Sequence, residues 1–119
     1  MSIVPNLRPI TQKGAPKRRT KAQRGPTEAE RAHMARVAEL GCVLCWHLGW
    51  GQAVPCEVHH QRTGIGAGKR ASHYQTLGLC WTHHRGPQGI HGMGRKAFEK
   101  HHCITELRLL AMTLMRLES

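Results

Sequence analysis

Cys80-Trp-Thr-His83-His84 is the segment that decides the fold, because it places a thiol and an imidazole three residues apart. Upstream, residues 42–45 read Cys-Val-Leu-Cys and supply two thiols at the same spacing. Thiolates and imidazoles at this spacing suit tetrahedral zinc, and soft thiolate ligands select zinc over magnesium or calcium. The two halves therefore predict a structural zinc site with the ligands Cys42, Cys45, Cys80 and His83.

The chain has five cysteines, an odd number, and its N-terminus lacks the apolar run of a secretory signal. Both features favour a reducing cytoplasm, where cysteines are metal ligands more often than disulfide partners. Cys56 and Cys103 are expected to be small buried residues, although Cys56 remains an alternative for one position of the zinc site. No apolar stretch approaches the ~20 residues of a membrane span, so no membrane partner is expected.

The positive charge of the chain is concentrated near its N-terminus. The 119 residues carry a formal net charge of +11, and residues 1–25 contain seven of the 18 lysines and arginines, Arg18 and Arg19 among them, without any acid. Prolines and the lack of apolar periodicity predict a disordered basic arm over residues 1–26 that becomes ordered on phosphates. Such a charge distribution attracts nucleic acid above other partners. Residues 27–119 then form one domain.

The pattern of this domain indicates an α+β fold with a small apolar core. It predicts short strands over 53–60 and 76–79 and helices over 27–40, 81–85, 94–101 and 105–117. Thr27 and Glu30 form a capping box that starts the first helix. Residues 41–60 contain too many glycines and prolines for a helix. The last helix is amphipathic, and its expected packing face consists of Leu107, Leu110, Ala111, Leu114 and Leu117.

Histidine is the second informative residue type, because ten histidines are far more than one zinc site needs. Adjacent side chains of a strand point to opposite faces, so one of His59 and His60 can bind a metal while the other meets a different partner. The pair His83 and His84 allows the same division. His59, His60, His73 and His84 lie in or beside the segment between the two halves of the zinc site, and they predict a second, functional centre.

These motifs together resemble the HNH endonucleases, whose ββα-metal core is often built around a zinc ribbon. A closer resemblance is to the phage recombination-enhancement nucleases, the Ref-like, RecA-dependent group. It rests on His59-His60, the glycine loop 64–69, the segment 80–84 and the segment 90–99, and it covers about residues 41–117. The resemblance implies a zinc-bound ββα-metal, treble-clef-like core with flanking helices behind the basic arm.

The resemblance also implies a role for each histidine of the functional centre. His60 would be the general base that activates water. His59 and His84 would bind the catalytic ion. His91 would complete the coordination of this ion or contact the scissile phosphate.

The middle residue of the HNH triad is usually Asn or Asp, and here the chain departs from the pattern. Its nearest counterpart is His73, or Gln75 when the positions are counted back from Cys80. The chain contains no aspartate, so the centre would use imidazoles where many relatives use Asp or Asn. The catalytic ion is left open between Mg²⁺, Mn²⁺ and Zn²⁺, because nitrogen ligands favour zinc whereas the other two are more available.

Basic residues lie close in sequence to these histidines. Those expected to hold a phosphodiester are Lys69, Arg95 and Lys96, together with Arg18 and Arg19 of the arm. Nothing in the sequence resembles a helix that reads base edges, so little sequence preference is expected. Binding through phosphates should weaken steeply with salt.

Three functions fit these features. The first, implied by the resemblance, is a metal-dependent DNA endonuclease of phage recombination in the host cytoplasm, with DNA and a RecA filament as partners. The second is a non-catalytic zinc-ribbon DNA-binding module, and the third is an adaptor for a recombinase. A structural zinc uses only four ligands, so the additional histidines favour the nuclease. The oligomeric state is left open by the sequence.

Overall fold

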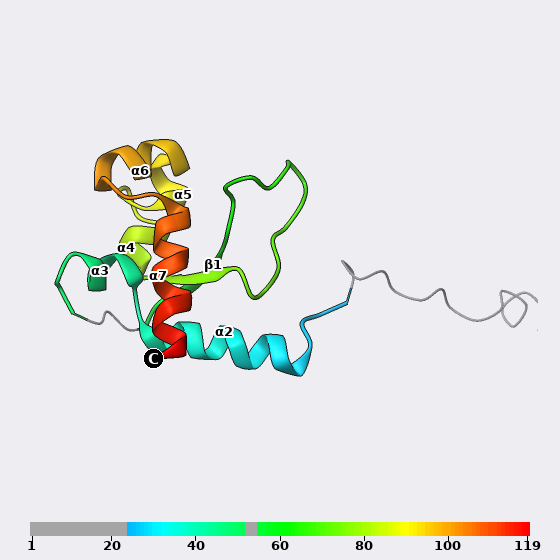
Figure 1. The fold of residues 1–119 in the computed structure, drawn as a ribbon. Helices are drawn as coiled ribbons and strands as arrows, with labels where there is room; N and C mark the ends of the chain where they lie inside the picture. Colours follow the sequence, from blue (N-terminus) through cyan, green and yellow to red (C-terminus); the bar gives the residue numbers. More distant parts are fainter. Residues whose placement is uncertain (1–23, 52–54) are drawn as a thin grey trace, which may run out of the picture.

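The computed structural model describes residues 24–51 and 55–119, so nearly all of the predicted basic arm, including Arg18 and Arg19, lies outside the described residues. Figure 1 shows the arrangement of the elements, which are α2 (Glu28–Leu40), α3 (Val43–His47), β1 (Glu57–His60), β2 (Thr76–Leu79), α4 (Trp81–His84), α5 (Ile90–Met93), α6 (Arg95–His102) and α7 (Glu106–Glu118). The fold is a small α+β domain, as predicted.

A ββα unit lies at the centre of this domain. β1 and β2 pair antiparallel, with Glu57 opposite Leu79 and His60 opposite Thr76. β2 is entirely buried and α4 follows it directly. The long loop between the strands projects from the domain (Figure 1), as expected for the glycine-rich segment. Because the start of β1 pairs with the end of β2, the unit brings β1 and α4 together.

Helix α2 covers β2 from one side. The predicted capping box is confirmed, because the Thr27 hydroxyl accepts from the Glu30 amide at 3.1 Å and the Glu30 carboxylate accepts from the Thr27 amide at 2.8 Å. The close packing of α2 on β2 requires Gly78, since a Cβ there would lie 2.6 Å from the carbonyl oxygen of Gly41. Arg36 of α2 donates to the carbonyl of Leu117 at 2.6 Å, which ties α2 to the end of α7.

The prediction that residues 41–60 contain no helix is wrong, because α3 forms within them. Its first turn is capped by the Cys42 thiol, which accepts from the Cys45 amide at 3.4 Å, and Val43 and Leu44 are buried. The glycines of residues 41–51 lie before or after this helix and therefore do not interrupt it. The described part of the predicted strand 53–60 is shorter than expected, since β1 begins only at Glu57. Helix α5 was also not expected.

Helix α7 forms nearly where it was predicted, but of its predicted packing face only Leu110 is buried. Leu107 is 46% exposed and Leu114 is 36% exposed. The residues that are buried are Glu106, Leu109, Leu110 and Thr113. The physical reason is that Glu106 turns inward to accept hydrogen bonds from His59 and from the start of the β1–β2 loop, which sets the rotation of the helix about its axis.

The apolar core is small and lies between β2, α3, α6 and α7. Its largest fully buried members are Leu44, Leu77, Leu79, Phe98 and Leu109. Among the helices of residues 24–51 and 55–119, none combines the length and hydropathy needed to cross a membrane. With so little apolar area to bury, the domain has to be held together by other means.

Helix α5 lies against the turn after α4 through an unusually close backbone approach. A Cβ at Gly92 would lie 1.8 Å from the carbonyl oxygen of Gly86, so only glycine fits. This approach brings His91 beside His84, whose ring centroid lies 4.6 Å from that of His91. Gly92 therefore positions a predicted site residue without offering a side chain itself.

We expect Gly92→Ala to lower the free energy of unfolding by about 1–3 kcal/mol, as overpacking typically does, despite the better helix propensity of alanine. Urea denaturation measures this change. Gly66→Ala is the matched control, because its Cβ would meet only the Lys69 side chain at 3.7 Å. Equal free energies of unfolding for the two variants would contradict this prediction and would show that the turn after α4 shifts to accommodate the methyl group.

Candidate metal centres and active site

Four sulfur and nitrogen ligands converge where α3 meets the start of α4. Cys45 Sγ lies 3.9 Å from Cys80 Sγ, and His83 Nδ1 lies 3.6, 3.5 and 3.3 Å from the sulfurs of Cys42, Cys45 and Cys80. Tetrahedral zinc with ordinary bond lengths gives edges of about 3.8 Å between two sulfurs and about 3.6 Å between sulfur and nitrogen. These four residues form a cluster that can hold a structural metal such as zinc.

The surroundings of this cluster fit a bound cation. Burial raises the pKa of the Cys42 and Cys45 thiols, and the neighbouring thiols raise that of Cys45 further. Buried thiols this close to one another become thiolates only around a positive charge, so metal binding would displace their protons. A sulfur or nitrogen atom occupies each corner of the tetrahedron, so these residues leave no coordination position open for a substrate.

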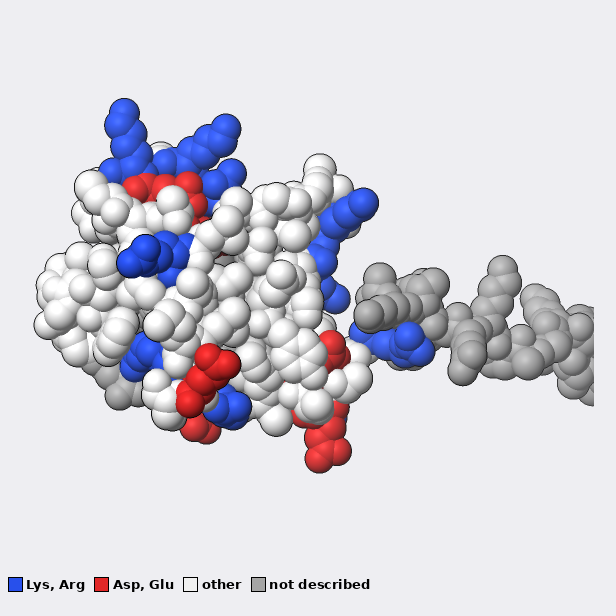
Figure 2. Space-filling view, viewed as in Figure 1, with Lys and Arg blue, Asp and Glu red and all other residues white. Residues whose placement is uncertain are grey.

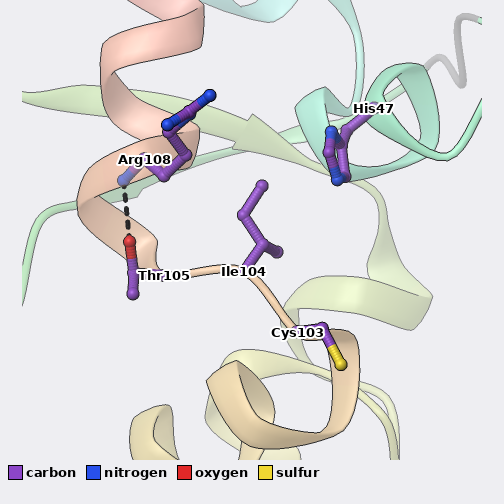
Figure 3. Close-up of a pocket in the computed structure, with 5 residues that line it drawn as sticks. All are labelled: His47, Cys103, Ile104, Thr105 and Arg108. Atoms are coloured by element: carbon purple, nitrogen blue, oxygen red, sulfur yellow. Dashed lines mark hydrogen bonds between the residues drawn. The ribbon is translucent and has the colours of Figure 1, made fainter.

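The two remaining cysteines lie outside the cluster. The Cys56 thiol donates to the carbonyl oxygen of Ala38 at 3.3 Å, so it replaces none of the four ligands. Cys103 is exposed, contrary to the expectation that it would be buried. Figure 3 shows it beside a separate surface hollow lined by His47, Ile104, Thr105 and Arg108.

A second cluster consists of three histidines from three elements. His59 comes from β1, His84 from α4 and His91 from α5, and one ring nitrogen of each lies within 4.8 Å of the others. His59 Nδ1 is 3.3 Å from His84 Nε2, which matches the edge of about 3.3 Å between two nitrogens around tetrahedral zinc. His59 and His84 are buried whereas His91 is exposed. The cluster therefore opens to solvent on one side.

Carboxylates hold the far side of two of these rings. His59 Nε2 lies 2.6 Å from Glu106 Oε2, and His84 Nδ1 lies 2.6 Å from Glu57 Oε1. Each carboxylate accepts the N–H of its imidazole, which fixes the tautomer and orients the ring; this is the usual outer partner of a metal-binding histidine. The hydrogen bond from His84 lowers the pKa of the Glu57 carboxyl.

This arrangement tests whether the histidines fit a cation. With one N–H of each ring given to a carboxylate, His59 Nδ1 and His84 Nε2 both present lone pairs to each other at 3.3 Å. Two lone pairs at this distance repel unless a positive charge lies between them. Three nitrogen ligands with one open position are also the pattern of catalytic zinc sites, as distinct from closed structural ones. The residues therefore fit a divalent ion.

His60, the neighbour of His59, has a different partner. Its Nε2 lies 2.9 Å from Nδ1 of His73, which comes from the end of the β1–β2 loop. Burial lowers the pKa of His60 and the nearby His73 lowers it further, so the imidazole stays neutral near pH 7. Gln75, the alternative to His73, instead accepts from the Ser72 amide at 3.3 Å.

Both histidines of β1 open onto one hollow of about 320 Å³. Its lining combines the histidines of the second cluster and His60 with basic residues of the β1–β2 loop, namely Arg62, Lys69 and Arg70. Figure 2 shows lysine and arginine side chains beside this loop and over the end formed by α5 and α6. Of the predicted phosphate contacts, Lys69 thus lies at the hollow, whereas Arg95 pairs with Glu99 at 3.2 Å on α6. Lys96 is exposed on the same helix.

A protein-family profile described as recombination enhancement, RecA-dependent nuclease matches residues 26–105, more than half of the chain. The chain belongs to this family of RecA-dependent nucleases. The match begins before α2 and ends just before α7, whereas the motifs indicated residues 41–117. No curated protein matches the chain closely enough to count as a relative.

Membership of the RecA-dependent nucleases agrees with the resemblance found from the motifs. The matched range contains both clusters and the His60–His73 pair. Sequence reasoning missed the two carboxylates, Glu57 and Glu106. Glu57 stands two residues before His59 on the same face of the strand, which is a usable signal. Glu106 lies one residue beyond the matched range, and an acid in the first turn of a helix already has an ordinary explanation.

We expect Cys45→Ser to remove one tightly held zinc per chain and, with it, cooperative folding, because small metal domains derive much of their folding free energy from the metal. Elemental analysis and thermal unfolding measure the two effects. Cys103→Ser is the matched control, since the exposed Cys103 lies outside the cluster. Zinc that remains bound to Cys45→Ser would remove Cys45 from the ligand set.

Proposed function

We propose that the chain is a metal-dependent DNA endonuclease of the HNH type that hydrolyses phosphodiester bonds with little sequence preference, in phage DNA recombination. The observation that carries the proposal is the difference between the two clusters. The Cys/His cluster is closed by four ligands, whereas the three-histidine cluster opens to solvent beside a neutral histidine and basic side chains. An open nitrogen site next to a base suits hydrolysis, and a structural site needs neither feature.

His60 is the proposed general base. Donating its Nε2–H to His73 leaves the lone pair on Nδ1 free to take a proton from water, and the contact with His73 holds the ring in place. His73 is then a positioning residue, in the role that Asn or Asp has in the HNH pattern. His59, His84 and His91 would hold the ion, which supplies the charge that stabilises the phosphate and the leaving oxygen.

The substrate side of the hollow is basic. Lys69 and Arg70 stand exposed at its edge, and Arg62 also lines it, so a DNA backbone would lie between the loop and the histidines. None of these groups is placed on a helix that could enter a groove, which supports phosphate contacts in preference to base contacts. The family description names RecA dependence, and we extend it to this chain: the DNA it cuts is bound in a RecA filament.

We expect His60→Ala to lower the cleavage rate by about 10²–10⁴-fold, the usual contribution of a general base, with DNA binding and metal content retained. Nicking of RecA-coated plasmid DNA with Mg²⁺, Mn²⁺ or Zn²⁺ measures this change. His101→Ala is the control, because the exposed His101 lies outside both clusters. If His60→Ala and the wild type both bind DNA and neither cuts it, the non-catalytic DNA-binding module becomes the better reading.

We expect Lys69→Ala and Arg70→Ala each to weaken DNA binding about equally on unrelated sequences and to reduce the salt dependence by about one phosphate contact. Fluorescence anisotropy at several salt concentrations gives both quantities. Arg108→Ala is the control, since Arg108 lines the separate hollow of Figure 3. A loss of affinity on one sequence alone would contradict the assignment to phosphate.

A further inference from the structure

Glu106 accepts more hydrogen bonds than an acid in the first turn of a helix needs. Its side chain is fully buried, and it accepts from His59 Nε2 at 2.6 Å, from the Thr63 amide at 2.7 Å and from the Thr63 hydroxyl at 2.6 Å. The Arg62 amide lies 3.0 Å from both carboxylate oxygens. The backbone of Glu106 is held in turn, because its own amide donates to Glu99 Oε2 at 2.8 Å.

The partners of this carboxylate come from two functional parts of the proposed nuclease. His59 belongs to the three-histidine cluster, and Arg62 and Thr63 open the β1–β2 loop that carries the basic edge of the hollow. The Arg62 side chain continues the connection, since its guanidinium donates to the Lys69 carbonyl at 2.8 Å and closes the loop on itself. One carboxylate therefore connects an ion-binding ring to the segment that ends in Lys69 and Arg70.

The charges of these groups indicate that the connection is more than mechanical. Among the described residues, the hydrogen-bond partners of the Glu106 carboxylate are an imidazole, two backbone amides and a hydroxyl, without a lysine or arginine side chain. Hydrogen bonds stabilise this buried anion, and a nearby positive charge would stabilise it further. An ion bound to His59 Nδ1 would supply it through the ring and would strengthen the hydrogen bond on Nε2.

We infer that Glu106 is a positioning residue that couples ion binding at His59, His84 and His91 to the ordering of the basic β1–β2 loop. The inference rests on the proposed function, which makes this loop the contact for DNA. Coupling of this kind is reciprocal: the ion orders the loop, and a loop held on DNA tightens the ion by the same factor. The nuclease would thus assemble its centre and its DNA contact together.

Glu106→Gln is the informative variant. It keeps the shape of the side chain and an oxygen that can accept from Thr63, but an amide NH₂ opposed to His59 Nε2–H favours the wrong tautomer of the ring. In protein that already holds its structural zinc, we expect a second equivalent of Zn²⁺ to bind about 10–100-fold more weakly than in the wild type. We also expect the slowing of hydrogen exchange that this Zn²⁺ causes at the Arg62 and Thr63 amides to disappear.

Two further variants separate the effect on ion binding from the effect on the loop. Glu57→Gln should weaken the second Zn²⁺ by a similar factor, because Glu57 contacts His84 and the exposed Arg85 but not His59 or the loop, yet saturating Zn²⁺ should still protect the loop amides. Thr63→Val should speed hydrogen exchange at the loop amides while leaving His59 in contact with Glu106. A Glu106→Gln protein that binds the second Zn²⁺ as the wild type does, or that retains ion-dependent protection of the loop, overturns the coupling.

The wild type keeps the test decisive if Glu106→Gln does not fold. Failure of the second Zn²⁺ to slow exchange at Arg62 and Thr63 in the wild type would by itself overturn the inference. Failure of the proposed function would give a different result. Wild-type protein would then take up two ions and protect its loop amides but would not cut RecA-coated DNA. In that case the chain is not a nuclease, whereas the coupling is retained.

Discussion

The convergence of three sulfurs and one imidazole nitrogen is the constraint on which the rest of this domain depends. It joins α3 to the end of β2 and the start of α4, and these helices of five and four residues are too short to be stable alone. His83, which belongs to this cluster, is followed at once by His84, which belongs to the other. A single helical turn, fixed at His83 by the Cys/His cluster, therefore places His84 in the three-histidine cluster.

The burial of Glu106 is the second constraint, and it decides how α7 sits on the domain. Leucines at positions 107, 110, 114 and 117 would form a continuous apolar face, yet the helix is rotated so that Glu106, Leu109, Leu110 and Thr113 face inward. Hydrogen bonds from an imidazole, two amides and a hydroxyl hold the carboxylate in place. Charged hydrogen bonds are each stronger than the burial of part of a leucine. The hydrogen bonds of Glu106 therefore determine the orientation of α7 more than the spacing of its leucines does.

The parts of the fold that the sequence predicts well are those specified by local chemistry. The capping box at Thr27, the paired ligand spacings and the positions of the two short strands all follow from residues close in the chain. Helix α3 was missed because its stability comes from the buried cluster and not from propensity. Glu106 was missed because its partners lie more than 40 residues away, and no periodicity reports such a contact. The packing of α5 against the turn after α4 is not visible in the periodicity either, because it depends on the close approach of Gly92 to the Gly86 carbonyl.

The lack of aspartate in the chain takes on a different meaning once the carboxylates are placed. A centre made only of imidazoles would carry no negative charge to hold a divalent cation. Glu57 and Glu106 provide this charge one ring further out, each through a hydrogen bond of 2.6 Å to a histidine of the cluster. Such partners fix the orientation of an imidazole and make its other nitrogen a better ligand for a metal ion. An ion held by these histidines would therefore be affected by the anionic charge through the rings, and the solvent-facing side of the cluster would stay open.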